Sequence, residues 1–196
     1  MSLIRPARDG RSGIASVEFA LLVPILALMF VGVAETVIYL RSWYRLDRTA
    51  AEVANVTTQY ETLTPSVVGQ ILDAASTLAS PLSASNTTTD VYKRARTVIS
   101  VVSGTASGNV LSWSCSRGDA NLATQVAGRA TLPNSMVVPT GQSVVVVEII
   151  NGARPWQALL RFFPEQVVAD PGPIRTYSIQ RPRIGTLNSL GGSCPT

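Results

Sequence analysis

Glu18 is the residue whose chemistry most needs an explanation, because it lies one helical turn inside an apolar stretch that follows a basic tail. A carboxylate costs about 2.5–3.5 kcal/mol at the centre of a membrane helix and less near its end, so such acids mark functional positions. If the chain were cut after Gly13, the new α-amine of Ile14 would lie four residues before Glu18 on the same helix face. Amine and carboxylate could then neutralise each other, within one chain or between neighbouring chains of a fibre. The spacing therefore predicts a role for Glu18 in assembly.

The chain offers little for catalysis. It contains no His, so the usual base for a Ser or Cys nucleophile is missing. Lys93 is its one lysine, and the GxSxG, P-loop and GxGxxG motifs are absent. A carboxylate pair such as Glu148 and Asp170 could still meet in space, whereas a zinc site usually needs four N or S ligands. We therefore predict a protein that is not an enzyme and that holds neither a metal nor another cofactor.

The basic excess does not indicate nucleic-acid binding. The 196 residues carry 16 basic and 12 acidic side chains, a formal charge of +4. The cations are scattered, without the stripe of cations and aromatics that nucleic acids require. Two groups of three arginines flank the apolar stretch: Arg5, Arg8 and Arg11 before it, and Arg41, Arg45 and Arg48 after it. We predict no nucleic-acid partner.

The apolar stretch is long enough to cross a lipid bilayer. Between Phe19 and Leu40 only Glu35 carries a charge, and the 22 residues span about 33 Å as a helix. A cleaved signal peptide is one alternative, because Gly32-Val33-Ala34 offers a small-residue site. A permanent anchor is another. Charge does not decide the orientation, since both flanks carry three arginines.

The residues around Glu18 also carry a resemblance. Gly13, followed by "IASV" and then Glu18-Phe19, resembles the prepilin-peptidase site of type IV-like pilins. The longer string "SVEFALLVPILALMFVGVAE" resembles the TadE family of Tad/Flp pilus pseudopilins, with Pro24 and Glu35 at the expected places. The later "YSIQRPRIG", residues 177–185, is similar to the "RPR" ending of that family.

The resemblance implies a minor pilin or pseudopilin that acts in biogenesis of a Tad-type pilus. Residues 1–13 would be a cytoplasmic leader, 14–40 the transmembrane half of a helix, and 41–196 a periplasmic domain. A prepilin peptidase would cut between Gly13 and Ile14. Phe19, Pro24 and Glu35 would then pack the helix among other subunits.

The same resemblance implies partners and a location. The partners would be the peptidase, other pilin subunits, the inner-membrane assembly platform and the lipid bilayer. The chain would cross the bacterial inner membrane once and could enter an extracellular pilus. Two rivals remain: a permanently anchored periplasmic assembly protein, and an exported adhesive or binding domain cut after Ala34.

The remaining chain predicts two helices and about four strands. Apolar positions at steps of three and four predict a helix over residues 15–59 and another over 66–80, with Val67, Val68, Ile71, Leu72, Ala75 and Leu78 on its apolar face. Alternating or continuous apolar residues predict strands at 91–102, 111–116, 142–150 and 174–180, with a hairpin loop at 103–109. The fold class is α+β: a long N-terminal helix, its first half transmembrane, packed on an antiparallel sheet as in pilins.

Cys115 and Cys194 predict one disulfide in an exported domain, with two unlinked buried thiols as the alternative. The alternation in "LSWSCS" places Leu111, Trp113 and Cys115 on one face of a strand. Closing a loop of roughly 80 residues would stabilise the fold by about 4–5 kcal/mol.

Two further groups could contact partners. In "RPWQALLRFFPEQ" the residues Trp156, Leu159, Leu160 and Phe163 share one helical face, which either packs on the sheet or docks another subunit. Arg181 and Arg183 could bind an anionic group or a partner's carboxylate, or form an ion pair within the fold.

Overall fold

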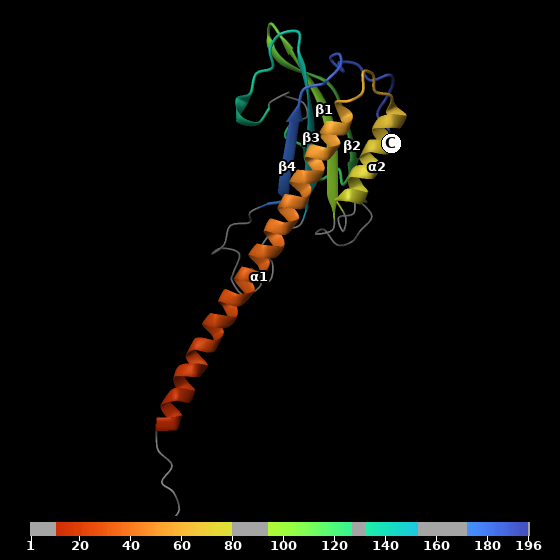
Figure 1. The fold of residues 1–196 in the computed structure, drawn as a ribbon. Coiled ribbons are helices and arrows are strands. Elements are labelled where there is room, and N and C mark those ends of the chain that lie inside the picture. Colours follow the sequence, from red (N-terminus) through yellow and green to blue (C-terminus); the bar gives the residue numbers. More distant parts are fainter. Residues whose placement is uncertain (1–10, 80–93, 127–131, 153–171, 196) are drawn as a thin grey trace, which may run out of the picture. The chain divides into compact units, whose positions relative to one another are not determined.

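A computed structural model describes residues 11–79, 94–126, 132–152 and 172–195, and side chains from residue 15 onward (Figure 1). Residues up to Ile38 belong to one compact unit, and the described residues from Tyr39 onward belong to a second. The second unit contains two helices and a four-stranded sheet. The predicted α+β class, with a long N-terminal helix and four antiparallel strands, is confirmed.

Helix α1 runs over Arg11–Thr57, close to the predicted residues 15–59. It contributes its first 28 residues to the first unit and continues into the second. Pro24 lies inside it, although proline removes one backbone hydrogen bond and favours a kink. No Gly or Pro occurs between Val33 and Tyr60, so nothing in the sequence interrupts the second half.

Helix α2 runs over Pro65–Leu78. Thr64 caps its N-terminus by accepting a hydrogen bond from the backbone N–H of Val67, and Pro65 occupies the first helical position. The predicted apolar face is buried at Val68, Ile71, Leu72 and Ala75. Val67 is partly buried, and Leu78, the last residue of α2, is 46% exposed.

The four strands form one antiparallel sheet in the order β2-β1-β3-β4. Their bounds are β1 Ala95–Thr105, β2 Gly108–Gly118, β3 Ser143–Asn151 and β4 Ile174–Gln180. Strand β3 is internal and every one of its residues is buried, as its continuous apolar run predicts. Strand β4 has the predicted bounds.

The first hairpin differs from the prediction. Strand β1 continues through residues that we expected in a loop, and only Ala106 and Ser107 separate it from β2. Thr105 pairs with Gly108 and its hydroxyl donates a 2.8 Å hydrogen bond to the Gly108 carbonyl. Gly108 has φ +113°, a conformation that side chains disfavour, so a glycine here permits the tight turn.

The prediction that Leu111 shares a face with Trp113 and Cys115 is wrong, because the strand register shifts between Val101 and Val102. Val101 pairs with Trp113 but Val102 pairs with Leu111, so Ser112 is an extra residue in β2. Leu111 therefore packs against a cluster on the opposite side of the sheet from Trp113 and Cys115. The alternation in the sequence alone cannot show this inserted residue.

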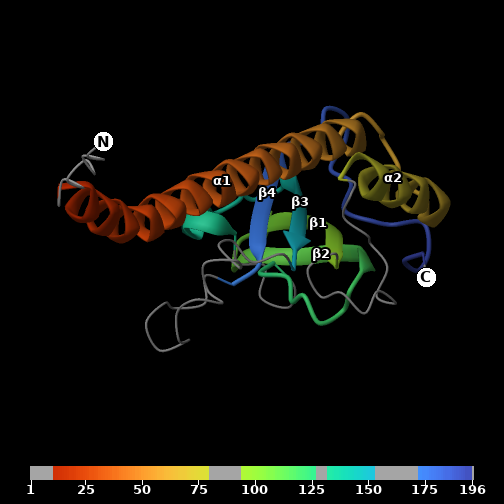
Figure 2. The ribbon, with the colours of Figure 1, turned by 90° about the horizontal axis from the view of Figure 1, so that it is seen from below.

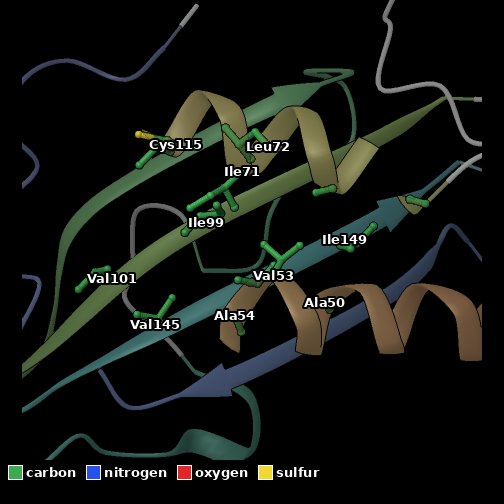
Figure 3. Close-up of a cluster of buried hydrophobic side chains, with 14 of the residues drawn as sticks. Ala50, Val53, Ala54, Ile71, Leu72, Ile99, Val101, Cys115, Val145 and Ile149 are labelled. Atoms are coloured by element: carbon green, nitrogen blue, oxygen red, sulfur yellow. The ribbon is translucent and has the colours of Figure 1, made fainter. Parts of the chain in front are cut away.

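Both helices cover the same face of the sheet within the second unit (Figures 1 and 2). The core between them combines side chains of α1, α2 and the strands (Figure 3), including Ala50, Val53, Ile71, Leu72, Ile99, Val101, Cys115, Val145 and Ile149. On the other face, residues of the β2–β3 connection cover Val102, Val144 and Val146. Each face of the sheet thus has its own hydrophobic cluster.

Candidate functional site

The candidate functional site is the N-terminal half of α1. Its large apolar side chains are exposed, including Phe19 at 67% and Phe30 at 79%. Among the described residues, α1 is the one helix that is long and apolar enough to cross a membrane. Exposed apolar surface on this scale is unfavourable in water, so this half of α1 needs a bilayer or other helices around it.

Glu18 is exposed on this half of α1. The helical backbone begins at Arg11, so Ile14 and Glu18 are four residues apart on one face, separated by about 6 Å along the helix axis. No described residue supplies a partner for the Glu18 carboxylate. The geometry therefore leaves this acid available to a group from outside the described chain.

Pro24 and Glu35 lie further along the same helix. Pro24 is exposed, whereas Glu35 is partly buried. Next to Glu35, the hydroxyl of Thr36 donates a 2.7 Å hydrogen bond to the Gly32 carbonyl, one turn back. Glu18 and Glu35 are 17 residues apart, so they project from different sides of the helix.

The structure joins Cys115 and Cys194 in a disulfide, as predicted, with 5.3 Å between their Cα atoms. Cys115 is 1% exposed and packs in the core below α2. Pro195, the residue after Cys194, lies against Gly69 of α2. The disulfide thus fixes the C-terminal tail, residues 181–195, next to α2 and β2.

Arg183 has a structural contact that differs from the expected ion pair. Its guanidinium Nη2 donates a 2.7 Å hydrogen bond to Oδ1 of Asn55, and its backbone N–H donates to the Thr58 carbonyl at 3.0 Å. Among the described residues no carboxylate contacts Arg183 or Arg181. Arg181 is exposed, and Trp156 and Phe163 lie outside the described residues.

Further contacts along the tail were not predicted. The indole Nε1–H of Trp113 donates a 2.8 Å hydrogen bond to the Leu187 carbonyl, and the Gly191 N–H donates to the Leu63 carbonyl at 3.2 Å. Leu63 and Leu187 are almost fully buried. Only the apolar character of these leucines could have indicated burial, and nothing local in the sequence indicates what they touch.

A groove with a volume of about 400 Å³ lies between α1 and α2. Its lining is mainly apolar and includes Val56, Tyr60, Val67 and Leu78. The described residues contain no group of three or more His, Cys, Asp or Glu side chains that could hold a metal ion.

A comparison with known protein families finds a match in the N-terminal part of the chain. Residues 13–55 match the family model described as TadE-like protein. The match begins at the glycine before the proposed cut and ends two residues before the end of α1.

Most of helix α1 is thus similar to the TadE-like family.

No curated protein and no solved structure matches the chain. The TadE-like match confirms, over residues 13–55, the resemblance that the sequence analysis describes. It covers a single structural element, because α2 and the sheet lie outside the matched residues. The similarity therefore concerns the helix that presents Glu18 and the exposed apolar surface.

Proposed function

We propose that this protein is a minor pilin or pseudopilin that acts in biogenesis of a Tad-type pilus. The observation that carries the proposal is the exposed Glu18 on a TadE-like helix whose apolar side chains are also exposed. Its function is assembly: α1 packs among the corresponding helices of other subunits, and no catalytic step is involved. Phe19, Pro24 and Glu35 contribute to that packing.

The proposal assigns a cut between Gly13 and Ile14 to a prepilin peptidase. The new amine carries a positive charge at neutral pH. Paired with Glu18, it reduces the cost of holding a carboxylate at membrane depth. The exposed position of Glu18 supports pairing between subunits, because a neighbouring chain can approach it.

The proposed topology follows from the same assignment. Residues 1–13 are cytoplasmic, residues 14–40 cross the bacterial inner membrane, and residues 41–196 form the periplasmic domain. The disulfide between Cys115 and Cys194 supports an oxidising compartment for that domain. The assembly platform in the inner membrane would then move the processed chain into the fibre.

The test is the intact mass and N-terminal sequence of the protein isolated from its own membranes. A chain that begins at Ile14 supports the proposal. A chain that begins at Met1 or Ser2 would make it a permanent anchor, and one that begins at Glu35 would make it an exported domain. Gly13→Ala should block processing, whereas the matched control Gly10→Ala should not.

A further inference from the structure

Three arginines form a stripe on α1 directly after the apolar stretch. Arg41, Arg45 and Arg48 are spaced by four and three residues, which places them on one face of the helix. All three are exposed, and the Arg48 side chain is 82% exposed. We call these three residues the arginine stripe.

Most of the arginine stripe lies opposite the face of α1 that packs on the sheet. That packed face includes Leu46, Ala50 and Val53, which are at most 4% exposed. At 100° per residue, Ala50 points about 180° away from Arg41. Arg41 and Arg48 therefore face away from the protein core, whereas Arg45 lies at the edge of the packed face, next to α2.

The position of the stripe along α1 matches the head-group layer of a bilayer. Arg41 directly follows Leu40, the last apolar residue. With a rise of 1.5 Å per residue, Arg45 and Arg48 lie about 7 and 12 Å from Leu40 along the helix axis. The head-group region adds about 5–7 Å on each side of the hydrocarbon. An arginine side chain can extend several ångströms towards it. Tyr44, 64% exposed and beside the stripe, suits the same layer.

Contacts within the protein occupy only some of the hydrogen-bond donors of the arginine stripe. The Arg48 guanidinium pairs with Glu52 at 2.8 Å, and the Arg45 Nε donates a 3.3 Å hydrogen bond to the Leu78 carbonyl. The other N–H donors of Arg45 have no hydrogen-bond partner among the described residues, and neither do those of Arg41. Arg41 and Arg45 thus retain most of their capacity to bind oxygen anions.

We propose that the arginine stripe binds the phosphate groups of anionic phospholipids at the outer surface of the membrane. This inference rests on the membrane-spanning part of the proposed function, and not on processing or pilus assembly. Arginine binds phosphate oxygens in a bidentate manner, and cations near a membrane surface attract anionic lipids. The three side chains lie in a row along the convex surface of a helix and do not converge on one point. This arrangement fits several lipid head groups in a layer better than one dissolved ion.

The stripe has a consequence for the processed chain. Removal of residues 1–13 would remove Arg5, Arg8 and Arg11. The arginine stripe would then supply the positive charge that flanks the membrane span. Contacts with anionic lipids would hold the processed subunit at the outer surface, and the subunit would have to release them when it leaves the bilayer.

The experiment measures lipid binding to the full chain. Phosphatidylglycerol and phosphatidylcholine with identical acyl chains are titrated separately into the detergent-solubilised protein, and bound lipids are counted by native mass spectrometry. We expect phosphatidylglycerol to bind about tenfold more tightly, and Arg41→Gln to weaken it about fivefold. Arg117→Gln, which removes an arginine of β2 whose guanidinium already pairs with Asp73 at 2.7 Å, is the matched control and should have no effect.

Several results would overturn the inference. One is equal affinity for the two lipids; another is an equal loss of affinity in Arg41→Gln and Arg117→Gln. A third is displacement of phosphatidylglycerol by inorganic phosphate beyond the effect of chloride at the same ionic strength, which would indicate a site for a free anion. Incorporation into phosphatidylcholine nanodiscs is a separate measurement, and its failure would contradict the membrane span itself.

Discussion

Arg183 donates a 2.7 Å hydrogen bond to Asn55, a residue that precedes it by 128 positions. The contact ties the "RPR" segment to the last turn of α1, where the TadE-like match also ends. The backbone N–H of Arg183 adds a second bond to the Thr58 carbonyl. The end of α1 and the start of the C-terminal tail are therefore fixed to each other.

Loss of the Arg183 side chain should weaken this attachment. We expect Arg183→Ala to lower the free energy of unfolding by about 1 kcal/mol, because one hydrogen bond to a charged donor is lost. Thermal unfolding of the full chain in detergent measures the change. Arg181→Ala removes an exposed arginine with no described contact and should leave the melting temperature unchanged. An equal decrease in both variants would show that the Asn55 contact contributes nothing.

Substitution of Glu18 should separate processing from assembly. Glu18→Gln keeps the size of the side chain but removes the charge that would pair with the α-amine of Ile14. We expect the chain to be cut normally while the amount of sheared surface pili falls to background. Glu61→Gln, an exposed acid outside the apolar half of α1, serves as the control. Normal pili in Glu18→Gln would refute amine pairing.

Reduction of the disulfide should destabilise the domain. The bond between Cys115 and Cys194 closes a loop with a sequence separation of 79, for which chain entropy predicts up to about 4–5 kcal/mol. We expect dithiothreitol to lower the melting temperature of the wild-type chain. The Cys115→Ser/Cys194→Ser variant should melt at the lower temperature with or without the reductant. A wild-type chain that is insensitive to complete reduction would contradict the expectation.

The buried pair of Glu148 and Arg175 should matter more than an exposed pair. Glu148 is 3% exposed, contacts the Arg175 guanidinium, and accepts hydrogen bonds from Thr124 and the Gln125 N–H. Glu148→Ala leaves these donors without their acceptor and should cost about 3 kcal/mol. Glu52→Ala breaks the exposed pair with Arg48 and should change the unfolding midpoint little. Urea titration compares the two, and equal midpoints would be the contrary result.

Acid should weaken the fold through Asp119. Hydrogen bonds from the backbone and side chain of Asn121, together with Arg94, hold the pKa of Asp119 below its ordinary value. A lowered folded-state pKa stabilises the fold above the unfolded pKa, and this contribution is lost as the pH falls through the folded pKa. The loss should therefore begin below about pH 4.

Asp119→Asn tests this pH dependence, because the amide cannot titrate. The variant should be less stable than the wild type at pH 7, and the difference should shrink as the pH falls below about 4. Chemical unfolding at a series of pH values measures both. A stability difference that does not change with pH would show that Asp119 acts through its shape alone.

Local patterns in the sequence were sufficient for the elements that carry the proposed function. A long apolar run with helical periodicity determined α1, and a nearly continuous apolar run determined β3 and its internal position. The spacing of Gly13, Ile14 and Glu18 can be read directly from the sequence. In a helix, Ile14 and Glu18 then lie about one turn apart on the same face. Two cysteines in a domain expected to be exported predicted the disulfide, with two unlinked thiols as the alternative.

Only the tertiary structure decided how distant segments meet. The extra residue Ser112 moved Leu111 to the other face of the sheet, and the tail placed Arg183 on Asn55. The fold also brings the Glu148 carboxylate into contact with Arg175 and with the β2–β3 connection. These contacts join residues separated by tens of positions. The periodicity of apolar residues gives information only about residues a few positions apart, within one helix or strand. They depend on strand register and chain path, which are set when the two faces of the sheet are buried together.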